Sequence, residues 1–210
     1  MVTVYCSTVG RRLAAFLVVG ILAASACSDT TGVSTSKVQI LLTDAPSDLI
    51  ASAEVWISHV YLQGGGGESA DGTTDGVGRV DLFNEPGSPH HFDLLMLRDG
   101  ITADLTGLVE VEAGLYQGLR LVVDSAKVTL VTGLAFVDGE DSATLKVPSG
   151  SQSGIKVMLN DEIDAAEGES TTLTVDFDVG RNFVIQGGQG QSAIRGILFT
   201  PVLLELGRDR

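Results

Sequence analysis

Short runs in which apolar and polar residues alternate extend from residue 37 to the end of the chain, separated by clusters of Gly, Asp, Ser or Asn. A period of two is typical of strands with one buried face. Ala53 to Leu62 is the clearest run, and Lys37 to Thr43 and Leu115 to Asp124 follow the same pattern. Roughly ten such strands, with turns every 8–12 residues, predict an all-β fold built as a single β-sandwich of immunoglobulin-like or prealbumin-like type.

One segment, His90 to Gly100, departs from this alternation and predicts the one short helix of the fold. Phe92, Leu95 and Met96 fall at helical spacing there, and Gly100 can end the helix in a left-handed turn.

Two residues within the predicted strands carry expectations of their own. Trp56, the single tryptophan of the chain, shares a predicted strand face with Val60 and Leu62. We therefore expect Trp56 in the core rather than exposed as a carbohydrate-binding surface would require. Pro201 interrupts the last predicted strand and indicates a sheet edge or a bulge there.

An uncharged, apolar segment near the N-terminus ends at Cys27, one of two cysteines in the chain. Arg11 and Arg12 precede this segment, Leu13 to Ala26, which has 14 residues. A membrane-spanning helix needs roughly 20 apolar residues. The segment matches the hydrophobic region of an export signal, which is about 7–15 residues long and followed by small residues.

The sequence AASAC at the end of this segment resembles the lipobox of bacterial lipoproteins, in which the cysteine becomes the acylated first residue. The usual lipobox has Leu three residues before the cysteine, whereas this chain has Ala24. We predict cleavage between Ala26 and Cys27 and lipidation of Cys27, because this explains why a cysteine stands at that position. Cleavage by the ordinary signal peptidase would instead give a secreted protein. Ser28 favours the outer membrane by resemblance to enteric lipoproteins.

These patterns divide the chain into four parts. Residues 1–26 form the signal peptide, and residues 27–36 form a lipidated tether that is rich in Ser, Thr and Gly and therefore flexible. Residues 37–206 form the β-sandwich domain, and residues 207–210 form a C-terminal tail.

The charge of the chain limits its partners. Acidic residues outnumber basic ones 27 to 13, for a net charge of −14. Such a surface repels phosphate backbones, so we expect no nucleic-acid partner. The expected partners are a membrane, reached through the lipid anchor, and an unknown envelope protein or glycan.

Six stretches occur in a fixed order along the chain: LLTDAPSD (41–48), FDLLMLRDG (92–100), EAGLYQGLRLVV (112–123), LKVPSGSQSGIKV (145–157), LTVDFDVGRNFV (173–184) and GILFTPVL (196–203). Together they resemble the bacterial domain-of-unknown-function family 4382, whose members are mostly lipoproteins or secreted proteins with a β-sandwich-like domain. The resemblance covers about residues 36–205 and implies export and a β-sandwich, with no established activity and no catalytic residues.

No residue pattern predicts catalysis. Ser153 and Lys156 satisfy the S-x-x-K nucleophile motif, but that motif needs a helix, and Ile155 to Leu159 alternates as a strand. The histidines, His59, His90 and His91, show none of the spacings that zinc sites use.

Carboxylates are numerous, and no spacing selects an acid–base pair. Calcium prefers loops that offer several oxygens at close spacing. Two loops suit it loosely, and their acids are weak candidates for a structural calcium site: Asp138, Glu140 and Asp141, and Asp71 and Asp75. No other metal and no organic cofactor is expected. Further acids are Asp44, predicted to accept backbone hydrogens in a turn at Pro46, with Asp48, Asp176 and Asp178.

The sequence thus predicts an exported, lipid-anchored envelope protein with a non-enzymatic binding or scaffolding module. A glycan- or peptide-binding domain with structural calcium is the alternative from a second class. A cryptic hydrolase is the third hypothesis.

Overall fold

The computed structural model describes residues 33–45, 47–65, 67–68, 74–75, 78–147, 153–187 and 194–210. The described residues all belong to one compact unit, Val33–Arg210. The predicted signal peptide (1–26), Ala26, Cys27, most of the tether (27–36) and Asp71 lie outside the described residues, as does the side chain of Asp75. Within the described ranges, no helix is long and apolar enough to span a bilayer.

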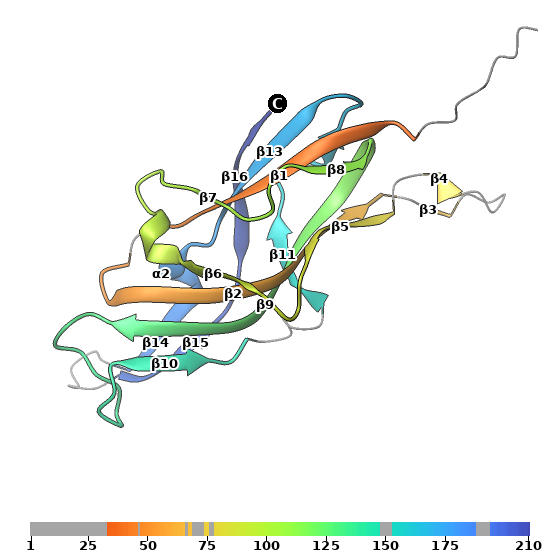
Figure 1. Ribbon diagram of the computed structural model, residues 1–210. Helices are drawn as coiled ribbons and strands as arrows, with labels where there is room; N and C mark the ends of the chain where they lie inside the picture. Colours follow the sequence, from red (N-terminus) through yellow and green to blue (C-terminus); the bar gives the residue numbers. More distant parts are fainter. Residues whose placement is uncertain are drawn as a thin grey trace, which may run out of the picture. The chain divides into compact units, whose positions relative to one another are not determined.

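The described part of the chain is mostly β-structure, as the alternating pattern predicts (Figure 1). Its strands are β1 (Thr35–Thr43), β2 (Ile50–Gly64), β3 (Gly67–Glu68), β4 (Thr74–Asp75), β5 (Arg79–Asn84), β6 (His90–Asp93), β7 (Ala103–Asp104), β8 (Val109–Glu112), β9 (Gly114–Leu130), β10 (Ser142–Leu145), β11 (Ile155–Met158), β12 (Ile163–Ala165), β13 (Ser170–Asp176), β14 (Phe183–Gly187), β15 (Ile194–Phe199) and β16 (Leu203–Asp209). Two single turns of helix complete it, the 3₁₀ turn η1 (Leu94–Leu97) and α2 (Val179–Asn182).

Most of these strands join one large, curled, mixed sheet in the order β5-β2-β9-β11-β16-β13-β1-β7. Its longest strands, β2 and β9, run side by side along nearly their whole length (Figure 1). Two of its pairings are parallel, β1 with β13 and β11 with β16. Strand β11 joins the two halves of the sheet, because Ile155 and Lys156 pair with β9 whereas Val157 and Met158 pair with β16.

Side chains from both halves of this sheet form a single hydrophobic core. Fully buried members include Ile40 and Leu42 on β1, Ile57 on β2, Leu121 on β9 and Val175 on β13. Burying one such aliphatic side chain contributes about 1.5–3 kcal/mol. The alternation in the sequence therefore reflects which face of each strand packs in this core.

A β-bulge in β2 changes which residues of that strand face the core. The register with β9 shifts between Trp56 and Ile57 and again between Ile57 and His59. Ala53, Val55 and Ile57 are buried before the bulge, and Val60 and Leu62 are buried after it. The prediction that Trp56 is a core residue, which rested on an unbroken alternation through Val60 and Leu62, is therefore wrong. Trp56 is partly exposed and stacks on His91.

The helix predicted over His90 to Gly100 is reduced to the single turn η1. Residues His90–Asp93 form β6 instead, which pairs with β2 and thereby satisfies its backbone groups in the sheet. The side chain of Asp93 accepts a hydrogen bond from the N–H of Leu95 and so starts η1. Gly100 has the left-handed conformation expected of it, with φ of 82°.

Pro201 lies in the break between β15 and β16, where the sequence predicted one strand with an edge or a bulge. Strand β16 then continues through Asp209, which pairs with Thr172 of β13. The segment after Asp176, predicted as further strand, instead turns into α2 before β14 begins. Residues of α2 and of the start of β14 line the candidate site described below.

Candidate binding site

The parallel strands β1 and β13 end side by side, with Thr43 paired to Asp176. The chain leaves β1 toward β2 through Asp44, and it leaves β13 through Phe177 and Asp178 into α2. Loops that follow the carboxyl ends of adjacent parallel strands meet at one edge of a sheet, and in open α/β sheets ligands bind at such edges. Two of the stretches quoted above, TDAPSD and DFDVGRN, therefore meet here.

A buried carboxyl group, that of Asp44, joins these two segments. Asp44 is 6% exposed, and its Oδ1 accepts a hydrogen bond of 2.8 Å from the N–H of Val179 at the start of α2. Its other oxygen, Oδ2, has no hydrogen-bond partner, and it is the one buried side-chain oxygen or nitrogen of the described residues in that state. Leaving a buried acceptor unsatisfied costs about 1–3 kcal/mol, and more when the group is charged.

The surroundings of Asp44 favour its neutral form. Burial raises the pKa of Asp44 from 3.8 to about 7. The hydrogen bond from the backbone of Val179 opposes this shift, and the negative charges of Asp176 and Asp178 add to it. Burial also raises the pKa of Asp176 above its ordinary value. Two carboxyl groups with raised pKa values, those of Asp44 and Asp176, thus lie at one edge of the sheet.

Hydrogen bonds fix the end of β1 from the other side as well. The hydroxyl of Thr43 donates to the carbonyl oxygens of Leu97, at 2.9 Å, and of Ile101, at 3.0 Å. The N–H of Asp44 also donates to the carbonyl of Leu97, at 3.2 Å. The η1 turn therefore holds Asp44 in place from the side opposite α2.

Asp178 starts α2 from an unusual backbone conformation. Its φ of 42° and ψ of 73° lie in the left-handed region, which Asp tolerates better than most residues. Its carboxylate caps α2 by accepting from the N–H of Arg181 at 3.1 Å, and it forms an ion pair with Nε of Arg181 at 3.2 Å. Asp176 Oδ1 in turn accepts from the N–H of Asp178 at 3.0 Å. The turn after β13 is therefore built from side chain to backbone contacts.

The far end of α2 is held by Asn182, which is fully buried. Its amide nitrogen donates to the carbonyl oxygens of Phe177 and Val202, and its Oδ1 accepts from the N–H of Val202 at 2.9 Å. Asn182 thereby fixes α2 to the link between β15 and β16.

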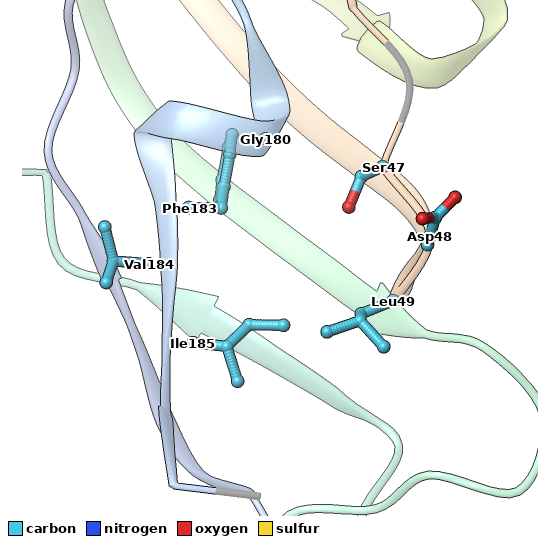
Figure 2. A pocket seen from close by; sticks show the side chains of 7 residues that line it. All are labelled: Ser47, Asp48, Leu49, Gly180, Phe183, Val184 and Ile185. Carbon is cyan, nitrogen blue, oxygen red and sulfur yellow. The ribbon is translucent and has the colours of Figure 1, made fainter. Parts of the chain in front are cut away.

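A pocket of about 560 Å³ opens between the link from β1 to β2 and the segment from α2 to β14. Leu49 and Ile185 point toward each other across it, and the hydroxyl of Ser47 points into it (Figure 2). The pocket is lined by Ser47, Asp48, Leu49, Gly180, Phe183, Val184 and Ile185.

This pocket is open to solvent, and its lining is partly apolar and partly polar. Ligand sites are commonly about 300–1,000 Å³, with mostly apolar walls and a few polar groups that orient the ligand. Here Leu49, Phe183 and Ile185 supply the apolar wall, and Ser47 and Asp48 supply the polar side. Asp44 is close in sequence to Ser47 on one wall, and Val179 is next to Gly180 on the other. The hydrogen bond from Val179 to Asp44 therefore connects the two walls.

The calcium candidates Asp138, Glu140 and Asp141 do not line this pocket. Asp138 Oδ1 accepts from the N–H of Glu140 at 3.1 Å within an exposed turn, and the backbone oxygen of Asp141 accepts from Leu130. Across the described ranges, no group of three or more His, Cys, Asp or Glu side chains is placed to hold a metal ion. Structural calcium stays a prediction.

The three histidines lie among different partners. His59 Nε2 is 2.9 Å from Asp81 Oδ1, His91 Nε2 is 3.0 Å from Glu54 Oε1, and His90 Nδ1 is 3.1 Å from the carbonyl oxygen of Leu105. None of these three pairs lines the pocket.

The two S-x-x-K residues do not share one element, because Ser153 is helical and Lys156 lies on a strand. Lys156 is on β11, opposite Arg120 of β9. The backbone oxygen of Ser153 accepts from the hydroxyl of Tyr61 at 2.8 Å. This geometry differs from the helix that the catalytic motif requires.

Sequence reasoning identified the carboxylates at this edge but missed its organisation. Asp44, Asp48, Asp176 and Asp178 were named as acids without a common site. The pocket residues Leu49, Phe183 and Ile185 and the buried amide of Asn182 carried no local signal. Asn182 follows Gly180 and Arg181, so the sequence around it gives no sign that its amide is buried.

The comparisons with known proteins give one match. A family model described as "Domain of unknown function (DUF4382)" matches residues 35–195, which include β1, β13, α2 and β14. No curated protein and no solved structure matches the chain.

Proposed function

The chain belongs to the DUF4382 family, and from that premise we propose that it is an exported, lipid-anchored envelope protein whose β-rich domain binds a ligand without chemical turnover. The single observation that carries the binding role is the pocket between the β1–β2 link and α2–β14, tied together by Asp44. The N-terminal sequence carries the anchoring role.

Anchoring rests on the position of Cys27. The cysteine follows 14 uncharged residues and precedes a run rich in Ser, Thr and Gly. Each buried acyl methylene contributes about 0.8 kcal/mol to membrane binding, and stable anchoring takes two chains or more. The outer membrane is the proposed destination.

Anchoring is tested on protein expressed with its full N-terminus in a Gram-negative host. The intact mass of the mature chain should begin at Cys27 and include acyl groups, and Cys27→Ser should move the protein from the membrane to the soluble fraction. A mature N-terminus at Cys27 without added acyl mass would establish secretion instead.

The finer fold type is also proposed, as a β-sandwich of immunoglobulin-like or prealbumin-like type. Two features of the sheet support it. Residues of both sheet halves share one core, and β11 passes from the half that contains β9 to the half that contains β16. Strands that change sheets at a corner are typical of two-layered β-structures.

The ligand of the pocket is a small amphipathic molecule. Its apolar part packs on Leu49, Phe183 and Ile185, and hydrogen-bond donors at its other end face Ser47 and Asp48. A net charge of −14 further favours a neutral or cationic ligand over an anionic one.

The binding role is tested by thermal denaturation of residues 27–210 against a library of small amphipathic molecules. A ligand of the pocket should raise the melting temperature of the wild type and fail with Ile185→Glu, which places a charge on the apolar wall. Leu198→Glu is the matched control, because Leu198 is an exposed residue of the adjacent strand β15, 48% exposed, that does not line the pocket. A ligand that binds both variants equally would remove the pocket from the proposal.

A further inference from the structure

The outer face of β2, β6 and β9 carries a second group of side chains that the pocket does not use. We call it the Trp56 face and define it by Glu54 and Trp56 on β2, His91 on β6, and Ser125 and Lys127 on β9. Its residues alternate with Val55, Ala126 and Val128, which are fully buried on the core side. The Trp56 face therefore looks away from the core.

The indole of Trp56 stands on this face between two different neighbours. On one side it stacks on the imidazole of His91, with ring centroids 4.6 Å apart and planes 24° from parallel. Trp56 pairs with His91 of β6 on one side of β2 and with Ser125 of β9 on the other side. Because the rings stack along the direction from strand to strand, the second face of the indole is turned toward β9. The neighbour on that side is Ser125, whose small side chain can cover only a small part of the second face, and Trp56 is partly exposed.

Hydrogen-bonding groups lie near the indole on the same face of the sheet. Glu54 lies two residues before Trp56, on the same face of β2. Its Oε1 is 3.0 Å from Nε2 of His91, and its Oε2 is 3.9 Å from Nζ of Lys127. The side chains of Glu54, His91 and Lys127 are 25%, 46% and 42% exposed. Donors and acceptors are thus held at fixed positions around the indole and still reach solvent.

We propose that the Trp56 face binds a neutral oligosaccharide built from pyranose rings, with one ring stacked on the free side of the Trp56 indole. The C–H face of a pyranose is apolar and packs on an aromatic ring, while its hydroxyls at the rim need donors and acceptors. Ser125, Lys127 and Glu54 supply them.

The charges of the Trp56 face select a neutral sugar over a charged one. The carboxylate of Glu54 is shared by Lys127 and His91, so the face presents no unpaired cation for an anionic sugar. The chain as a whole carries a charge of −14, which adds a long-range repulsion for anions. This proposal does not depend on the pocket, because the two sites share no residue.

Intrinsic fluorescence tests this proposal directly, because Trp56 is the single tryptophan of the chain. The protein, residues 27–210, is titrated with gluco-, xylo-, manno- and N-acetylglucosamine oligosaccharides of four to six units, up to 10 mM. At least one neutral series should give a saturable change in Trp56 emission. Calorimetry on the same samples gives the affinity independently of the fluorophore.

Substitutions then locate the bound sugar. By calorimetry Trp56→Ala should weaken binding at least tenfold, Trp56→Phe by less, and Lys127→Ala by about threefold to tenfold. Met158→Ala, a 51% exposed residue of β11 outside the Trp56 face, should leave the affinity unchanged. Melting curves of the variants identify any loss of binding that comes from unfolding.

Four results would overturn the proposal. The first is the absence of any emission change or heat with every neutral series at 10 mM. The second is sugar binding that Trp56→Ala leaves unchanged, and the third is binding of anionic glycans alone. A protein partner captured on this face in the absence of sugar binding also counts against it.

Discussion

Asp44 and Val179 are 135 residues apart in the sequence, yet Oδ1 of Asp44 accepts a 2.8 Å hydrogen bond from the N–H of Val179. The contact joins the segment that leaves β1 to the segment that leaves β13. It leaves Oδ2 of the same carboxyl group buried and without a partner. The free energy of this contact should therefore depend on whether Asp44 carries a proton.

The stability of the domain should fall as pH rises through the range in which Asp44 ionises. Its pKa is about 7 in the folded chain, against about 3.9 in an unfolded one. The folded state thus holds a proton between these values that the unfolded state has lost, so the stabilisation is complete below about pH 4 and lost as pH approaches 7. Asp44→Asn removes this titration. Its free energy of unfolding relative to wild type should rise by roughly 2–4 kcal/mol from pH 4 to pH 7.5.

Urea denaturation at several pH values measures this difference. Asp48→Asn, which removes an exposed carboxylate from the same link, is the matched control. Asp176 should keep a weaker slope of the same sign in the Asp44→Asn variant, because burial raises its pKa too. Identical pH profiles for the Asp44 and Asp48 variants would show that Asp44 ionises freely in the folded state.

Asp178 should prove replaceable by Asn but not by Ala. Asn tolerates the left-handed backbone and still offers an oxygen to the N–H of Arg181. Asp178→Gly loses the cap and the ion pair but fits the backbone, at a cost of about 1 kcal/mol. Asp178→Ala loses the cap and adds backbone strain, for about 2–3 kcal/mol in total. Midpoints of thermal and urea unfolding give the order, and a stability of Ala equal to that of Gly would contradict the strained conformation.

The strands were predictable because the alternation of apolar and polar residues that indicates each strand lies within that strand's own sequence. Ile155 and Val157 are buried on β11 and their neighbours Lys156 and Met158 are exposed, as the alternation required. Where a bulge shifts the phase, the same reasoning fails. Trp56 was assigned to the core by counting on to Val60 and Leu62, but the bulge at Ser58 shifts the phase of the alternation. Ser58 is buried there, and its hydroxyl donates to the exposed Asp124 at 2.6 Å.

The candidate site was not predictable, because its contacts are not local. The pairing of β1 with β13 brings Asp44 to Val179, and nothing near either residue indicates parallel pairing. The acids were visible as TDAPSD and DFDVGRN, and turn chemistry was the local expectation for both. Only the sheet order explains why one of these acids is buried against the other segment.

Removing Arg208 should strongly destabilise the end of β16, because it leaves a buried charge unpaired. The side chain of Glu205 is 3% exposed and lies 3.0 Å from Arg208 Nε, and its Oε2 also accepts from the N–H of Asn160 at 2.9 Å. Arg208 further donates to the backbone oxygens of Asp161 and Glu162. Arg208→Met should cost about 3–5 kcal/mol.

Adding Glu205→Gln to Arg208→Met should recover part of this loss, since the neutral amide needs no counter-charge. Chemical denaturation of the two single variants and the double variant gives the coupling free energy. A double variant no more stable than Arg208→Met would mean that the loss comes from the backbone contacts of Arg208 rather than from the unpaired carboxylate.

Gly154 should be the least replaceable glycine at the corner where β11 joins the two halves of the sheet. Its φ is 69°, and an added Cβ would lie 3.3 Å from the carbonyl oxygen of Leu121 and 3.2 Å from Cβ of Arg120. Gly168 has a similar φ of 73° but open space around it. Gly168→Ala should therefore cost about 1 kcal/mol for the backbone alone, and Gly154→Ala about 2–3 kcal/mol. The difference between the two unfolding free energies isolates the close approach of β9 at Gly154. Equal losses would mean that the corner can relax around a methyl group, and that β11 is packed less tightly on β9 than its pairing with Leu121 indicates.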